Sequence, residues 1–170
     1  MAQMKEFSQL PDLEDLDFET PAYKKRALVA ELAGGLYGFP LGGLITVFSV
    51  AQITPLPNVP RHILGLANFR NEILPVIDIG TKLHPSRPFS YKEHNRLVKV
   101  PFESTSVSIV TERVVDILHY GFEEILSSTD GPSANLPHSW IQEFIRFQEQ
   151  EICVLNIAAI LKELYHEPSH

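Results

Sequence analysis

A short run of closely spaced prolines limits the folds open to this chain more than any other stretch. Pro55, Pro57 and Pro60 each fix φ and each withhold a backbone hydrogen-bond donor. The segment 54–60 therefore cannot lie inside a helix or within a central strand. We expect a stiff, extended segment that leads into the residues that follow it.

Two apolar runs follow this extended segment, and a short polar break separates them. The runs are 63–69 and 73–77, and the break contains Arg70 and Asn71. Asparagine tolerates the left-handed backbone conformation that a tight hairpin turn needs. The stretch therefore predicts two adjoining antiparallel strands with Arg70 at their turn. The guanidinium there could clamp neighbouring carbonyl groups or bind a carboxylate of a partner.

Further apolar runs of strand length occur along most of the chain. The pair Gly34-Gly35 separates the first two and suits a hairpin turn. The run 44–50 is β-branched and apolar on both faces, so we expect it to be covered on both sides. Residues 97–100 and 106–111 alternate as half-buried strands do. The expected strands are 26–32, 36–41, 44–50, 63–69, 73–77, 96–100, 106–120, 140–147 and 152–155.

The C-terminal part of the chain has the spacing of an amphipathic helix. Ile157, Ile160, Leu161 and Leu164 stand at i, i+3, i+4 and i+7, and Asn156 before them is a competent N-cap. No other segment is long enough to be a crossover helix between parallel strands. The sequence therefore predicts an all-β barrel architecture with one terminal helix.

Charge and hydropathy exclude some classes of function. The formal net charge of −7 disfavours a protein that tracks a nucleic-acid backbone, which needs a basic stripe. No apolar stretch approaches a membrane span, and the N-terminus lacks the features of a signal peptide, so we expect a cytoplasmic protein without direct membrane insertion.

The chain ends are polar. Residues 1–22 form an acidic arm, which we expect to be flexible, and residues 166–170 form a polar tail. A second reading of the arm is that its apolar residues dock on a partner or on the domain itself. These residues are Leu10, Leu13, Leu16 and Phe18.

A search for catalytic groups gives no candidate enzyme site. The only helix-spaced histidines are His166 and His170, and Pro168 between them disrupts the helix that a metal site would need, so we expect no metal and no cofactor. Cys153 lies among apolar residues and is expected to be a buried small hydrophobe. Asp78 could pair with Arg70 or cap a short helix at 79–83.

The run from residue 65 to residue 78 resembles the hallmark of the CheW family, the adaptor proteins of bacterial chemosensory arrays. That hallmark reads Gly-x-x-Asn-x-Arg-Gly-x-x-x-Pro-x-x-Asp, and one position departs from it, because Asn71 stands where the family usually has glycine. The resemblance extends in register back to Tyr37 and covers about residues 26–164. The matching residues of the hallmark are Gly65, Asn68, Arg70, Pro75 and Asp78.

The resemblance implies a fold and a function. The fold would be two small five-stranded SH3-like β-barrels packed together within residues 23–165, followed by the C-terminal amphipathic helix. The function would be that of a non-enzymatic adaptor. One barrel would bind the regulatory domain of a chemosensory histidine kinase, and the cytoplasmic tip of methyl-accepting receptors would bind near the groove between the barrels.

The resemblance also implies which residues bind partners. Leu44 falls where a hydrophobic residue contributes to receptor contact, and Arg70 falls where the family arginine is needed for it. Thr46 stands where many members carry a glutamate linked to kinase binding, which hints at a divergent system such as one that controls type IV pili and twitching or phototaxis. Asn68 and Asn71 flank the arginine as further candidates. Leu44 as a core residue and Arg70 as a structural clamp stay open as alternatives.

Two other functions remain open from the sequence. One is a β-barrel that binds a small ligand or acts as an enzyme on an unknown substrate. The other is a nucleic-acid-binding barrel, which the negative charge disfavours.

Overall fold

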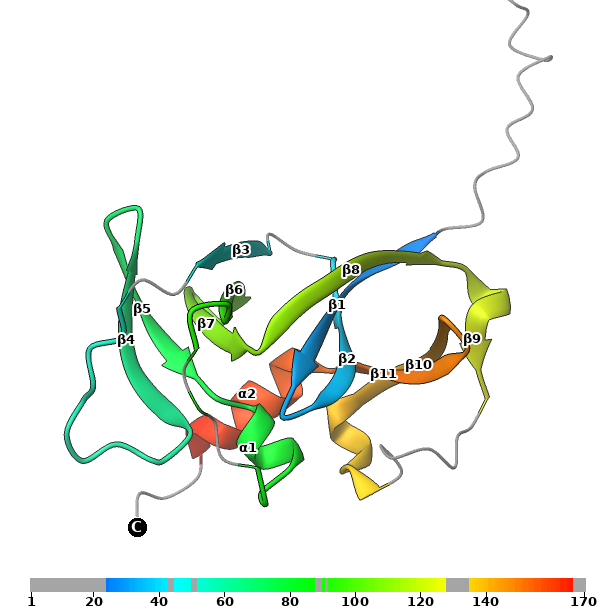
Figure 1. Ribbon diagram of the computed structural model, residues 1–170. Coiled ribbons are helices and arrows are strands. Elements are labelled where there is room, and N and C mark those ends of the chain that lie inside the picture. Colours follow the sequence, from blue (N-terminus) through cyan, green and yellow to red (C-terminus); the bar gives the residue numbers. More distant parts are fainter. Residues whose placement is uncertain are drawn as a thin grey trace, which may run out of the picture.

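The computed structural model describes residues 24–42, 45–49, 52–87, 90, 92–127 and 135–166. Strands dominate this part of the chain and form two curled sheets, with one longer helix at the end (Figure 1). The predicted all-β fold of two small barrels and a C-terminal helix is confirmed. The predictions for the arm at 1–22 and for residues 167–170 of the polar tail fall outside the described residues.

The first sheet, called barrel 1 below, combines strands from both ends of the chain. A parallel pairing of β2 with β11, in which Tyr37 lies opposite Cys153, joins the N-terminal hairpin to the C-terminal one. The strand order is β8-β1-β2-β11-β10-β9, so the two-residue β9 adds a sixth strand to the five that were expected. The strands are β1 (Lys25–Leu32), β2 (Gly35–Pro40), β8 (Arg113–Tyr120), β9 (Ile125–Leu126), β10 (Ile141–Phe147) and β11 (Gln150–Leu155).

The second sheet, barrel 2, uses only the middle of the chain. Its order is β3-β6-β7-β5-β4, and β5 pairs with β7 in parallel at Val76 and Ser108. The proline-rich segment before β4 joins the two edges of this sheet, because Thr54 follows β3 and exchanges two backbone hydrogen bonds of 2.8 Å with Leu66. It is not extended throughout as expected, since the chain turns at Pro57 and Asn58, where Asn58 has φ of 56°. The strands are β3 (Thr46–Ser49), β4 (Ile63–Phe69), β5 (Glu72–Ile77), β6 (Arg96–Phe102) and β7 (Thr105–Thr111).

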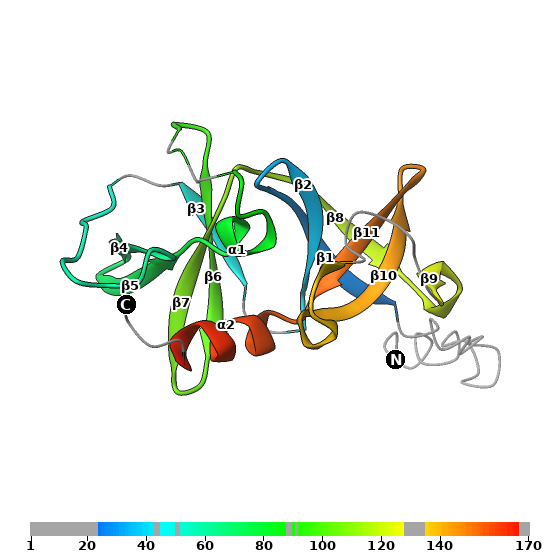
Figure 2. The ribbon, with the colours of Figure 1, turned by 90° about the horizontal axis from the view of Figure 1, so that it is seen from below.

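A single apolar core spans the seam between the barrels. It contains side chains of β1 and β2 from barrel 1 and of β6 and β7 from barrel 2, together with the helix α2 (Ile157–His166). Figure 2 shows α2 lying along barrel 2 and beginning near the junction of the two barrels. Burial of this shared surface removes apolar area from water and fixes the barrels to each other.

The helix α2 forms as the sequence predicts. Ile157, Ile160, Leu161 and Leu164 are buried, and the Asn156 side-chain oxygen accepts the backbone N–H of Ala159 at 3.1 Å. The asparagine is therefore the N-cap, because it satisfies a donor that the first turn leaves free.

We expect Asn156→Ala to lower the free energy of unfolding by about 1 kcal/mol, because the first turn of α2 would lose its capping acceptor. Urea denaturation followed by circular dichroism measures the change. Asn156→Ser keeps an acceptor at the same position and should stay within a few tenths of a kcal/mol of the parent protein. Equal losses in both variants would mean that the side chain stabilises the fold in another way.

Short helical elements complete the chain. The helix α1 (Gly80–Leu83) begins beside Asp78, a buried residue whose carboxylate accepts the Thr81 N–H at 3.1 Å. Asp78 therefore accepts a donor of the first turn of α1 from the position before the N-cap Ile79, and among the described residues it forms no pair with Arg70. Two 3₁₀ turns, η2 (Phe122–Glu124) and η4 (His138–Trp140), flank the segment that contains β9. No helix in the described residues is long and apolar enough to cross a membrane.

Several local predictions need correction. The single strand expected at 106–120 is two strands, β7 and β8, which separate at Glu112 and belong to different barrels. The first hairpin turns at Ala33 and Gly34, with φ of 49° and 78°, and Gly35 already belongs to β2. The strand β3, which is the described part of the apolar run 44–50, is not covered on both sides, because it is an edge strand and Val47 is 39% exposed. In the second half of β7 the side chains on both faces are buried, so buried and exposed residues do not alternate there. The reason is that β7 lies in the middle of its sheet, against the shared core.

Candidate functional site

The candidate site is built around the turn of the β4–β5 hairpin. Arg70 and Asn71 both adopt left-handed conformations, with φ of 50° and 67°. Asn71 meets the expectation for this position, whereas arginine at positive φ is uncommon. The Asn68 side-chain oxygen accepts the Asn71 backbone N–H at 3.2 Å and so closes the turn from within. The tip is consequently held in one geometry by its own residues.

The hallmark glycine keeps this hairpin against the proline-rich segment. Gly65 has φ of +142°, a conformation that residues with a side chain rarely adopt. A Cβ there would lie 2.1 Å from the Thr54 carbonyl oxygen and 2.9 Å from the Pro55 Cα. The position needs glycine both for its backbone angles and because another backbone passes so close.

The Arg70 side chain is exposed and rests on an aromatic ring. The guanidinium carbon lies 5.2 Å from the centroid of the Phe69 ring, and the Phe69 and Phe48 rings are 4.4 Å apart. Stacking of this kind orients the guanidinium while most of its donors stay available. Among the described residues no carbonyl or carboxylate accepts a hydrogen bond from Arg70, so the structure gives no support to the structural clamp.

The contact of Phe69 with Phe48 brings the hairpin tip to β3. Thr46, two residues before Phe48, is half-buried and lies opposite Lys99 of β6. The Lys99 ammonium in turn forms an ion pair with the Glu72 carboxylate, next to the hairpin turn. The predicted residues Thr46, Asn68, Arg70 and Asn71 are therefore linked through one end of barrel 2, and Leu44 lies outside the described residues.

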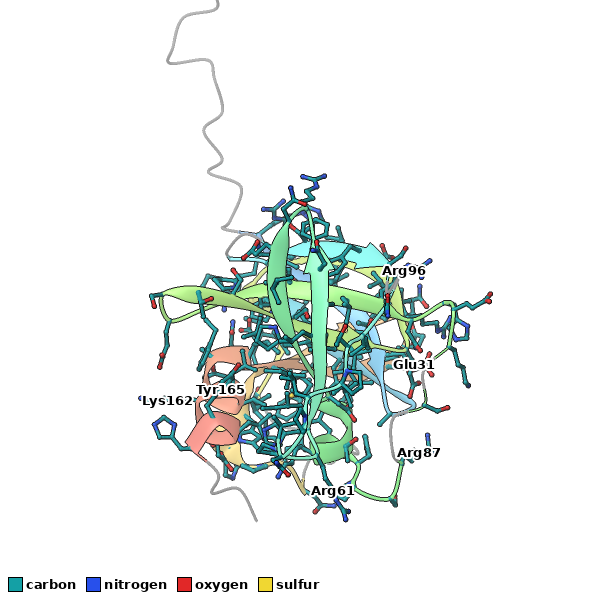
Figure 3. All side chains as sticks on the ribbon, turned by 90° about the vertical axis from the view of Figure 1, so that its left-hand side faces the viewer. Glu31, Arg61, Arg87, Arg96, Lys162 and Tyr165 are labelled. Atoms are coloured by element: carbon teal, nitrogen blue, oxygen red, sulfur yellow. The ribbon has the colours of Figure 1, made fainter. Side chains whose placement is uncertain are left out.

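Figure 3 looks onto the side of the molecule that carries β4. The strand begins close to Arg61, at the bottom of the view, and runs to the hairpin tip at the opposite end. Two exposed apolar side chains of this barrel, Val47 of β3 and Ile73 of β5, are additional surface features that the sequence did not single out. Val47 belongs to the run that was expected to be covered, and only the position of β3 at the sheet edge reveals its exposure.

The described residues do not assemble a recognisable reaction centre. They contain no group of three or more histidine, cysteine, aspartate or glutamate side chains placed to hold a metal ion. One open hollow of about 350 Å³ lies at the tips of the β1–β2 and β10–β11 hairpins, where the Tyr37 hydroxyl and His84 Nε2 are 2.8 Å apart. Burial raises the pKa of Tyr37 to about 12, so its hydroxyl stays protonated near neutral pH.

Cys153 is fully buried, as expected, and burial raises the pKa of its thiol to about 12. Because the thiolate is the reactive form, we expect alkylation of the folded protein by iodoacetamide at pH 8 to be about a thousandfold slower than that of an exposed cysteine. Mass spectrometry follows the reaction over time. The urea-unfolded chain should react at the ordinary rate, and fast modification of the folded chain would contradict the buried position.

Comparisons with known proteins agree on one family. Residues 26–164 match the family described as CheW-like domain. A probable chemotaxis protein CheW of Rhizobium etli is 24% identical over 129 residues, which cover 72% of this chain and 82% of that protein. A chemotaxis protein CheW of Klebsiella aerogenes is 30% identical over 98 residues, 58% of each chain.

The similarity to a solved structure concerns the fold. The scaffolding protein TtCheW of Thermoanaerobacter tengcongensis superposes with a TM-score of 0.69 at 20% sequence identity, over 81% of this chain and 87% of the other.

Proposed function

The chain belongs to the family of CheW-like domains, and from this membership we propose that it is a non-enzymatic adaptor that couples chemoreceptors to a chemosensory histidine kinase. The observation that carries the proposal is the family match over residues 26–164 together with an exposed arginine at the tip of a rigid hairpin. An adaptor transmits a signal through the geometry of its contacts, so it needs no reaction centre. The alternative of a ligand-binding or enzymatic barrel is not favoured by the relatives.

The proposal assigns a partner to each region. The regulatory domain of the kinase binds one barrel, and the cytoplasmic tip of methyl-accepting receptors binds near the groove between the barrels. The protein then works on the cytoplasmic side of membrane-associated receptor arrays, with residues 23–165 as its binding unit. The contact residues in this proposal are Leu44, Thr46, Asn68, Arg70 and Asn71.

Arg70 supplies the strongest single contact in this scheme. Its guanidinium has several free donors, is stacked on Phe69, and stands at a turn that the Asn68 side chain closes. A planar fork that is held in this way binds a carboxylate through two parallel hydrogen bonds with little loss of conformational freedom. A partner segment with an acidic side chain fits the tip best.

A carboxylate close to Thr46 comes from a different strand. Many family members carry a glutamate where this chain has Thr46, and here the Glu72 carboxylate pairs with Lys99, which lies opposite Thr46 in the sheet. We infer that Glu72 supplies the negative charge for the kinase contact. In this proposal the negative charge lies on Glu72 of β5 and not at position 46 of β3. The different position favours a kinase of a divergent system, such as one that controls type IV pili and twitching or phototaxis.

We expect Glu72→Gln to weaken binding of the kinase regulatory domain by about 5–10-fold, because the interface would lose a charged partner. The free energy of unfolding should change by less than about 1 kcal/mol, since the pair is partly exposed. Calorimetric titration measures the affinity, and Glu149→Gln, an exposed position in barrel 1, is the matched control. If both variants bound the kinase domain with equal affinity, the kinase contact would not involve Glu72.

Direct binding tests the proposed function. The purified chain is titrated with the regulatory domain of the chemosensory kinase and, separately, with a receptor-tip fragment. We expect saturable binding at micromolar protein concentrations to both. Failure to bind either partner, with the circular dichroism spectrum of a folded β protein, would refute the adaptor function.

A further inference from the structure

Two large hydrophobic side chains are exposed close to the point where the described chain begins. Phe122 is 71% exposed and Ile117 is 51% exposed. The Lys25 ammonium at the start of β1 lies 6.0 Å from the centroid of the Phe122 ring. Lys25 also lies opposite Tyr120 in the sheet, and Tyr120 stands between Ile117 and Phe122 in the sequence. The described residues therefore begin beside the exposed Phe122 ring, and the adjoining surface of β8 carries the exposed Ile117 opposite Leu28.

Basic side chains surround this surface. Lys24, Arg26 and His119 are exposed, and Arg26 lies opposite His119 in the pairing of β1 with β8. Lys24 and Arg26 have no ion-pair partner among the residues that the structure describes. The surface thus combines two exposed apolar side chains with two basic side chains, Lys24 and Arg26, that form no ion pair with a described residue.

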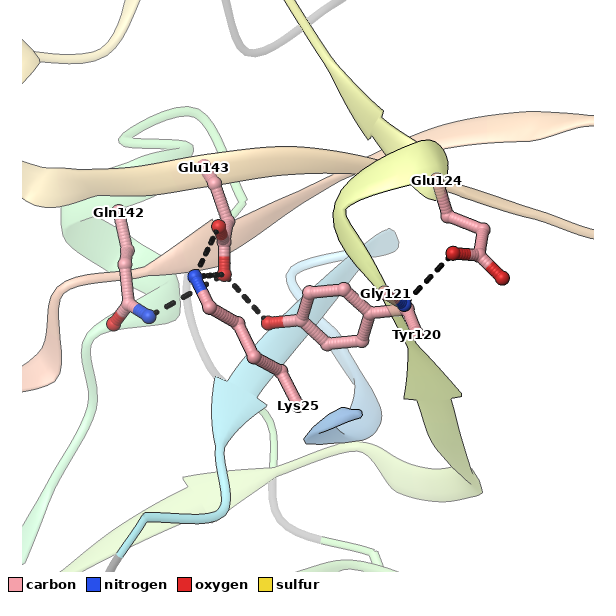
Figure 4. Close-up of polar contacts among 6 residues, drawn as sticks. All are labelled: Lys25, Tyr120, Gly121, Glu124, Gln142 and Glu143. Carbon is pink, nitrogen blue, oxygen red and sulfur yellow. Dashed lines mark hydrogen bonds and ion pairs between the residues drawn. The ribbon is translucent and has the colours of Figure 1, made fainter. Parts of the chain in front are cut away.

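Three acidic side chains nearby are already engaged, whereas Glu123, next to Phe122 in the sequence, is exposed. Figure 4 shows the Glu143 carboxylate accepting hydrogen bonds from Lys25 and from the Tyr120 hydroxyl, at 2.8 Å and 2.7 Å, and the Glu124 carboxylate accepting the Gly121 N–H at 2.7 Å. Asp116 likewise accepts the backbone N–H of its neighbour Ile117 at 2.7 Å. These three carboxylates are held by local donors, which leaves Lys24 and Arg26 to attract negative charge from elsewhere.

The sequence that precedes Lys24 has the complementary composition. Residues 1–23 contain six acidic residues and one lysine, a net charge of −5 out of −7 for the whole chain. Apolar residues alternate with the acidic ones in the second half of this segment. The apolar residues are Leu10, Leu13, Leu16 and Phe18, and the acidic residues are Glu6, Asp12, Glu14, Asp15, Asp17 and Glu19.

The length of the chain permits this segment to reach the surface. Phe18 is six residues before Lys24, so an extended chain carries it up to about 20 Å from that point. Leu13 and Phe18 are five residues apart, as are Ile117 and Phe122. A tether this short also gives a high local concentration, on the order of millimolar, so weak contacts suffice for docking.

We propose that residues 10–19 of this chain dock on Ile117 and Phe122, with their carboxylates facing Lys24, Arg26 and His119. The docked segment covers this end of barrel 1 and competes with any partner that binds there. Because the attraction depends on exposed charges, salt weakens it. The proposal does not depend on the adaptor function.

Paramagnetic relaxation measured by NMR on the full chain tests this docking. Ser8→Cys provides the attachment point for a nitroxide label near neutral pH, where Cys153 does not compete because it is buried and its pKa is raised to about 12. We expect the label to broaden the amide signals of residues 116–122 several-fold more than those of residues 63–77. Ile117→Ser/Phe122→Ser, or about 1 M salt, should remove the difference.

Matched controls separate docking from other causes. Ile73→Ser removes an equally exposed hydrophobic residue from barrel 2 and should leave the broadening at 116–122 unchanged. Unchanged amide positions outside the substituted region verify that the double variant is folded. Uniform broadening over both barrels, or broadening that the double substitution does not change, would overturn the proposal. Broadening seen only between labelled and unlabelled copies would also overturn it, because a second molecule would then be the occupant.

Discussion

Gly65→Ala is expected to lower the free energy of unfolding by about 3–5 kcal/mol. The residue has φ of +142°, and an added methyl group would lie 2.1 Å from the Thr54 carbonyl oxygen. The clash involves backbone on both sides, so no side chain can move aside to relieve it. We expect the melting temperature to fall by about 10 °C or more, as measured by scanning calorimetry.

Gly42→Ala is the matched control for this substitution. No atom of the described residues lies within 4 Å of a Cβ at Gly42, so the free energy of unfolding of this variant should stay within about 0.5 kcal/mol of the parent value. A small loss for both variants would mean that the segment around Thr54 can move away from β4 at little cost. The account of the hallmark glycine would then be wrong.

Arg70→Ala is expected to weaken partner binding by about 1–3 kcal/mol, which corresponds to about 5–150-fold in affinity. The exposed guanidinium contacts only the Phe69 ring among the described residues, so the folded protein loses little with it. The melting temperature should therefore change by less than about 2 °C. Titration against each partner and calorimetry of the free protein measure the two effects separately.

Two further variants define the role of the arginine. Arg61→Ala removes another exposed arginine, at the base of β4, and should bind as the parent protein does. Arg70→Lys keeps the charge but loses the planar fork, so it should recover only part of the affinity. A large loss of stability in Arg70→Ala would show that the side chain holds the hairpin together, contrary to the proposed contact with a partner.

The local chemistry of the sequence predicts the central hairpin well. Prolines at 55, 57 and 60 keep their segment out of helices and central strands, although it turns at Pro57 and Asn58 and is not extended throughout. The strands β4 and β5 flank the Arg70-Asn71 turn as expected. Asn156 and the apolar spacing after it predict the helix α2. These features depend on backbone angles and on short-range periodicity, which a sequence displays directly.

Contacts between distant segments are the part that the sequence does not display. Burial of β7 on both faces follows from its central place in a sheet, and the exposure of Val47 follows from its edge strand. At the candidate site, the contact of the tilted Phe48 and Phe69 rings and the Lys99–Glu72 pair link strands that are far apart in the chain. Apolar pattern alone cannot distinguish these partners, because many pairings satisfy it equally.

Coupling of receptor and kinase by this chain is the central claim, and co-sedimentation tests it most directly. Receptor fragments assembled on vesicles are mixed with the purified kinase, with and without the full chain, and the kinase in the pellet is measured. The account predicts that the kinase sediments with the receptor only when the chain is present, and that Arg70→Ala reduces the sedimented kinase severalfold while Arg61→Ala does not. Equal sedimentation of the kinase with and without the chain would contradict it.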